Sequence, residues 1–61
     1  MRYVARDFYE DPDGEILCCS NSWFECALAC QERDEDTNCE CDCIIEDTIT
    51  GEIYNEEWYN V

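Results

Sequence analysis

Alternation of apolar and polar residues at the start of the chain predicts a β-hairpin. Residues 2–9 are rich in β-forming side chains, with Val4 and Phe8 on one face. The segment 10–14, Glu-Asp-Pro-Asp-Gly, predicts a turn, because proline presets φ and Asp-Gly favours a left-handed corner. Residues 15–19 then supply the returning strand, so the first two strands are expected to pair.

The next segment has the spacing of a helix. Ser22 and Glu25, three residues apart, match a capping box and predict a helix over residues 23–33. If the start of the helix shifts, Asn21 or Ser20 serves as the capping residue instead. Its main apolar face carries four small or aromatic side chains, Trp23, Cys26, Ala27 and Cys30.

Phe24 and Leu28 extend the apolar arc of this helix beyond what packing on one sheet face requires. Two interpretations stay open. In the first, the helix lies deep in a small core. In the second, Phe24 and Leu28 form the oligomer contact of a homodimer or a contact with a different partner.

The second half of the chain predicts another hairpin. Polar residues 34–38 end the helix, residues 39–47 alternate as a strand, and residues 48–52 turn into a short strand at 53–54. One face of the longer strand would carry Cys39, Cys41, Cys43 and Ile45, and the other Glu40, Asp42, Ile44 and Glu46.

The order strand, strand, helix, strand, strand predicts an α+β fold. We expect a small antiparallel sheet of three to four strands with one helix packed on one face. With 61 residues, the chain is expected to form a single domain over 1–61, with 55–61 as a looser acidic and aromatic tail.

Composition excludes several classes of function. The chain has no histidine, which excludes a Ser-His-Asp triad and histidine metal ligands. Its formal charge of −14 comes from 17 acids and three arginines, so we expect no direct binding to nucleic acid or to an anionic membrane. No segment approaches about 18 consecutive apolar residues, so no transmembrane span is predicted. We expect no catalytic residue, because so short a chain has little room to desolvate an acid pair.

The acids themselves form the main candidate site. Side chains on one face of a strand repeat every 6.6 to 6.8 Å or so, and phosphates along one DNA strand lie about 3.4 Å apart. A sheet that carries carboxylates therefore presents a phosphate-like field, which suits the basic groove of a nucleic-acid-binding protein. The candidate partner-binding residues are Asp34, Glu35, Asp36, Glu40, Asp42, Glu46, Glu56 and Glu57.

In size, charge and β-rich layout the chain resembles the small acidic DNA-mimic inhibitors that phages use against host defences. This resemblance implies a non-enzymatic inhibitor of the phage anti-defence or host-takeover class. Its partner would be a basic nucleic-acid-binding protein: a nuclease, a restriction or CRISPR component, or a transcription factor. The alternatives are another acidic interaction role and a plain solvated acidic surface.

Seven cysteines allow three further interpretations. They are small reduced side chains of the core, or they form disulfides from helix to strand, or they hold zinc. The zinc-stabilised or disulfide-stabilised module is the alternative function, although we expect no metal and no cofactor. The candidate zinc ligands are Cys26, Cys30 and two of Cys39, Cys41 and Cys43.

The compartment is predicted from the first residues. Residues 1–7 lack the apolar core of a signal peptide, so we expect a cytoplasmic protein, in the host cell if a phage encodes it. The alternative is a secreted protein whose signal has been removed.

Overall fold

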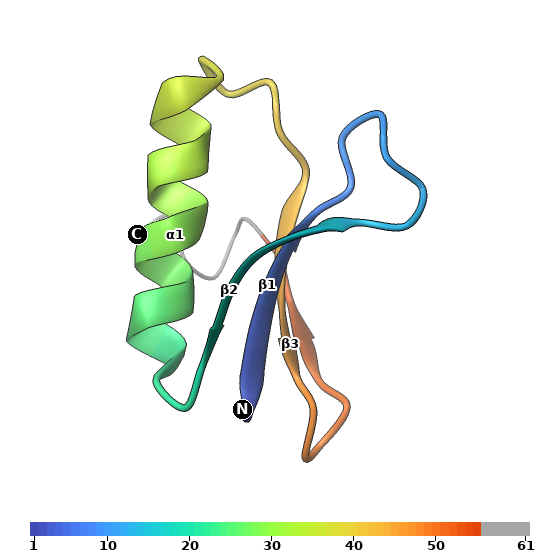
Figure 1. Cartoon of the computed structure of the whole chain (residues 1–61), viewed down its shortest axis with the longest axis vertical. Coiled ribbons are helices and arrows are strands. Elements are labelled where there is room, and N and C mark those ends of the chain that lie inside the picture. Colours follow the sequence, from blue (N-terminus) through green and yellow to red (C-terminus); the bar gives the residue numbers. More distant parts are fainter. Residues whose placement is uncertain (56–61) are drawn as a thin grey trace.

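The computed structural model of the chain describes residues 1–55 as a four-stranded sheet covered by one helix. The helix α1 (Trp23–Asp36) crosses one face of the sheet and contacts its first three strands (Figure 1). The strands are β1 (Tyr3–Asp7), β2 (Glu15–Ser20), β3 (Cys43–Asp47) and β4 (Ile53–Tyr54), all antiparallel, in the order β2-β1-β3-β4. The predicted α+β fold and its ββαββ order are confirmed.

Strand register determines which side chains face α1. Ala5 pairs with Cys18 on one side and with Ile45 on the other, and both Ala5 and Ile45 are fully buried. The other face of the sheet carries Val4, Arg6, Ile16, Cys19, Ile44, Glu46 and Ile53. We call it the open face.

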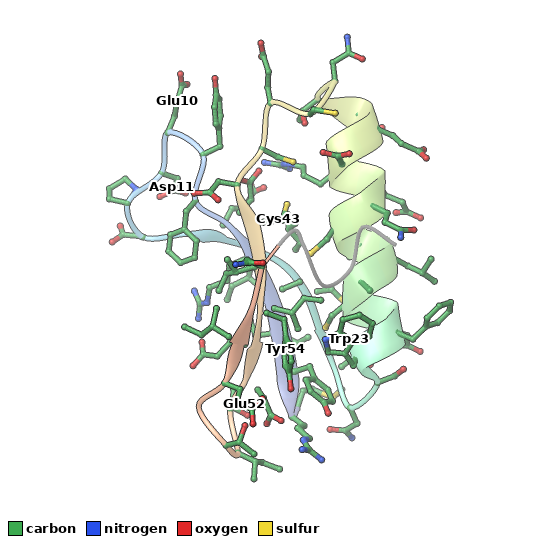
Figure 2. The ribbon with its side chains drawn as sticks, turned by 180° about the vertical axis from the view of Figure 1, so that it is seen from behind. Glu10, Asp11, Trp23, Cys43, Glu52 and Tyr54 are labelled. Carbon is green, nitrogen blue, oxygen red and sulfur yellow. The ribbon has the colours of Figure 1, made fainter. Side chains whose placement is uncertain are left out.

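The core beneath α1 is small. Its buried hydrophobic side chains are Ala5, Cys26, Ala27, Cys30, Cys43 and Ile45. The helix face predicted from Trp23, Cys26, Ala27 and Cys30 does pack on the sheet. Trp23 lies at the margin, where its ring meets that of Tyr54 edge to face, with centroids 6.1 Å apart (Figure 2).

The start of α1 is where the sequence predicts it, but the predicted capping box is wrong. Ser22 is the N-cap residue, yet its side chain makes no capping hydrogen bond. Instead, the hydroxyl of Ser20 donates to Glu25 Oε2 at 2.5 Å and accepts the Ser22 N–H at 3.0 Å. Ser20 ends β2 and is buried, so its hydroxyl already lies beside the first turn of the helix.

The helix ends later and β3 begins later than predicted. Acids 34–36 form the last turn of α1, and the hydroxyl of Thr37 donates to the Arg33 carbonyl at 2.8 Å. Asn38 and Cys39 then adopt φ of 56° and 68°, which is left-handed and incompatible with an extended strand. The predicted strand over 39–47 is therefore wrong for 39–42 and confirmed only from Cys43 to Asp47.

The turn between β1 and β2 depends on Gly14, whose backbone lies close to the Phe8 ring. Gly14 has φ of 78°, and a Cβ there would lie 2.6 Å from Phe8 Cε1. The backbone N–H of Gly14 donates to the Asp11 carbonyl at 3.3 Å, and that of Asp11 donates to the Phe8 carbonyl at 3.2 Å. These bonds fold the loop against the Phe8 ring. They also place its acids at the same end of the molecule as the end of α1 (Figure 1).

Within residues 1–55, α1 is the only helix, and it is too short and too polar to span a membrane.

Candidate functional site

Two connections meet at one end of the molecule: the β1–β2 loop and the loop that follows α1 (Figure 1). The backbone N–H of Phe8 donates to the Asp42 carbonyl at 2.9 Å. The N–H of Asp42 donates in turn to Oδ1 of Asp7 at 3.0 Å. These two bonds tie the loops together, so their side chains belong to one surface.

This surface is strongly acidic, and we call it the acidic end. Figure 2 shows Glu10 and Asp11 on the β1–β2 loop at this end. The acidic end consists of the carboxylates of three segments, namely the β1–β2 loop, the last turn of α1 and the following loop: Glu10, Asp11, Asp13, Asp34, Glu35, Asp36, Glu40 and Asp42. Six of them are exposed, and Asp11 and Asp34 are half-buried.

One of the three arginines, Arg33, lies beside the acidic end and is paired with two other carboxylates. The Nε atom of Arg33 lies 2.9 Å from Oδ2 of Asp7, which is 3% exposed, and its Nη2 atom lies 2.6 Å from Glu15 Oε2. Burial raises the pKa of Asp7, but the N–H groups of Asp42 and Tyr9 together with Arg33 outweigh it and hold that pKa below its usual value. Arg33 is thus engaged by the buried Asp7 and the exposed Glu15, and it forms no ion pair with a described carboxylate of the acidic end.

A second ion pair to a buried carboxylate lies at the opposite end of the sheet. Asp47, 2% exposed, accepts hydrogen bonds from Arg2 at 2.9 Å, from the N–H of Ile49 at 3.0 Å and from that of Thr50 at 3.3 Å. Hydrogen bonding to Arg2 lowers the pKa of Asp47 to about 2. The third arginine, Arg6, lies on the open face, where its Nη1 is 3.5 Å from the Gly14 carbonyl. Within residues 1–55, no ion pair involves a carboxylate of the acidic end.

A cleft of about 510 Å³ opens at the acidic end, between the end of α1 and the start of the β1–β2 loop. Exposed Asp36 and Glu40 contribute two of its carboxylates, while Arg33 on its wall is engaged by Asp7 and Glu15. Its lining residues are Asp7, Tyr9, Arg33, Asp36, Thr37, Asn38 and Glu40. The cleft therefore has a mainly polar lining that includes exposed carboxylates.

The structure brings five of the predicted partner-binding residues together and separates one. Those at the acidic end are Asp34, Glu35, Asp36, Glu40 and Asp42. Glu46 lies on the open face instead, paired in register with Val4 and Ile53. Glu56 and Glu57 lie outside the described residues.

The predicted ladder of carboxylates along one strand is therefore wrong. Residues 39–42 form a loop rather than a strand, so Glu40 and Asp42 do not share a strand face with Glu46. Asp34 is not a freely exposed carboxylate, because it accepts hydrogen bonds from the Cys41 and Cys39 thiols at 3.4 and 3.6 Å. The acids are presented by three neighbouring segments at one end instead of by one strand.

The sequence interpretation did not include Glu10, Asp11 and Asp13, which it assigned only to a turn. The order of the elements along the chain could have shown that these three acids lie near the end of α1. With strands and helix alternating in direction, the β1–β2 turn and the end of α1 fall at the same end of the fold. Acids in those two connections are consequently neighbours.

The proposed dimer residues and the cysteines can also be located. Phe24 is 65% exposed and Leu28 is 42% exposed on the outer side of α1, while their role in a homodimer stays a prediction.

No disulfide joins the cysteines, all seven of which lie within residues 1–55. No group of three or more Cys, Asp or Glu side chains among residues 1–55 is arranged to hold a metal ion.

Comparison of the chain with protein-family profiles, with curated proteins and with solved structures finds no match in any of the three.

Proposed function

We propose that this protein is a non-enzymatic binding protein whose acidic end occupies the basic groove of a nucleic-acid-binding protein. It would act as a DNA-mimic inhibitor of the phage anti-defence or host-takeover type. The observation that carries the proposal is the acidic end itself: eight carboxylates from three segments, with the nearby guanidinium of Arg33 paired to Asp7 and Glu15 outside this set.

Charge placement supports this proposal more than charge quantity does. An ordinary acidic surface intersperses lysine and arginine among its acids. Here two of the three arginines pair with the buried Asp7 and Asp47, which leaves the outer field negative. Such a field steers a positively charged groove toward the acidic end and competes there with phosphates.

Local anchoring supports it as well. The loops of the acidic end are held by the backbone bond from Phe8 to Asp42, by the bond from the Asp42 N–H to the Asp7 carboxylate and by the Arg33 ion pairs. Carboxylates fixed in this way lose less conformational entropy on binding than those of a flexible acidic tail.

A displacement assay tests the proposal. Fluorescent duplex DNA is bound to each member of a panel comprising a non-specific nuclease, a restriction endonuclease, a CRISPR effector and a transcription factor. The protein is then titrated at about 50 and 200 mM salt, a range over which electrostatic affinity falls steeply. Displacement from a panel member that weakens with salt supports the proposal, and failure to displace DNA from any member contradicts it.

A further inference from the structure

The layer between α1 and the sheet is rich in thiols. Three of the six core side chains are cysteines, namely Cys26, Cys30 and Cys43, and two of the others are alanines. A core of such small side chains buries little apolar surface. Single domains near 60 residues are already marginal on their hydrophobic core alone and often add a covalent cross-link.

One pair of thiols in this layer joins two different elements. Cys18 lies on β2 opposite Ala5, so its side chain is on the face covered by α1. The Cys26 sulfur lies 3.9 Å from the Cys18 carbonyl oxygen, and the two thiols are also in side-chain contact. Cys18 is half-buried and Cys26 fully buried, so an outside reagent reaches Cys18 first.

We propose that Cys18 and Cys26 are a thiol–disulfide exchange site, which reacts with a small-molecule disulfide to form a bridge between β2 and α1. This site is independent of the proposed binding function. It assigns a covalent role to two thiols that the acidic end does not use.

The exchange balances in two steps. The Cys18 thiolate attacks one sulfur of the small disulfide, whose S–S bond breaks and releases one small thiolate, which takes up a proton. The Cys26 thiolate then attacks the Cys18 sulfur, and the second small thiolate leaves and is protonated. Two protein thiols lose two electrons and two protons, and the small disulfide gains them.

The positions of the neighbouring cysteines distinguish them from the Cys18–Cys26 pair. Cys19 is adjacent to Cys18 but pairs with Val4 on the open face, so it points away from Cys26. Cys30 and Cys43 contact each other, yet they are 0% and 2% exposed and out of reach of a reagent in solution. Cys41 contacts Cys43 but lies two residues away along the same backbone, a spacing that suits a disulfide poorly.

Burial sets the pH dependence of the second step. It raises the pKa of Cys26 to about 11, so little of the attacking thiolate is present at neutral pH. Closure of the mixed disulfide should therefore accelerate about tenfold for each pH unit up to that value.

To test this, dilute protein is incubated with oxidised glutathione, and samples are quenched with acid at successive times. The remaining thiols are then alkylated, and the mass of the intact protein is measured. We expect Cys18 and Cys26 to become protected from alkylation through a bridge that removes about 2 Da, with no glutathione retained on either of these two residues. Cleavage after glutamate should then join peptide 16–25 to peptide 26–32, and fragmentation should place the bridge at Cys18 and Cys26.

Two variants make the test specific. Cys19→Ser removes the neighbouring thiol on the opposite face and should close at the wild-type rate. Cys18→Ser changes a half-buried side chain and should abolish closure. Retention of glutathione on Cys18 without closure, a bridge mapped to another pair, or closure in Cys18→Ser would each overturn the proposal.

Discussion

The Nε atom of Arg33, near the end of α1, lies 2.9 Å from Oδ2 of Asp7, the last residue of β1. Through Nη2 the same guanidinium contacts Glu15, the first residue of β2. One side chain thus joins the helix to two strands directly beneath the acidic end. Removing it leaves a buried carboxylate with backbone N–H donors but without its cation.

The first prediction concerns this contact. Arg33→Met should lower the free energy of unfolding by about 2 kcal/mol, since Asp7 keeps its burial and loses a charged hydrogen bond. Arg6→Met is the matched control, because it changes the net charge equally but removes only a 3.5 Å contact to the Gly14 carbonyl. It should cost no more than about 0.5 kcal/mol. Urea unfolding measures both, and equal losses would mean that net charge, rather than the Asp7 contact, is responsible.

The second prediction concerns acid. The pKa of Asp47 is about 2 in the folded protein, mainly through hydrogen bonding to Arg2, and about 3.9 in an unfolded chain. A lowered folded pKa means that the carboxylate stabilises the fold above about pH 4 and loses this effect as the pH falls toward 2. Asp47→Asn should therefore be less stable than the wild type at pH 7, and the difference should vanish between pH 4 and pH 2 or so. Thermal unfolding across that range tests it, and a constant difference would exclude the Asp47 charge as the cause.

A third prediction compares two glycines with the same φ of 78°. Gly14→Ala brings a Cβ to 2.6 Å from the Phe8 ring, whereas Gly51→Ala meets nothing within 4 Å. Gly51→Ala should cost about 1 kcal/mol for the left-handed backbone alone. Gly14→Ala should cost at least about 2 kcal/mol, because Phe8 must also shift. Denaturant unfolding of the two variants separates backbone strain from the clash, and similar losses would rule out the close approach as a determinant of the turn.

The fold was largely predictable because its signals are local. The turn ending in Gly14 and the helical spacing of Cys26 and Cys30 each depend on a few neighbouring residues. Strand order was not predictable, because pairing of β1 with β3 joins residues about 40 positions apart, such as Tyr3 and Asp47.

The candidate site was predicted less well. The alternation over 39–47 suggested a strand, but the left-handed Asn38 and Cys39 override it locally. The ion pair between Arg33 and Asp7 could not be predicted either. The two residues are 26 positions apart in sequence, and the burial of Asp7 follows from packing under α1. The sequence therefore located the acids in the last turn of α1 and in the following loop, but not their neighbours on the β1–β2 loop.

The most direct test of the proposed function compares two variants of equal charge in the DNA displacement assay. One replaces three acids of the acidic end with amides: Glu10→Gln, Asp36→Asn and Glu40→Gln. The other replaces three acids in the opposite half of the fold: Glu25→Gln, Glu46→Gln and Glu52→Gln. Both sets are isosteric and change the net charge from −14 to −11, by replacing three of 17 acids.

The acidic-end variant should lose at least about tenfold in affinity for the panel protein, whereas the control variant should stay within about threefold of the wild type. Circular dichroism first establishes that both variants are folded. Equal losses in the two variants would show that total charge, rather than its placement at the acidic end, drives binding, and would contradict the account.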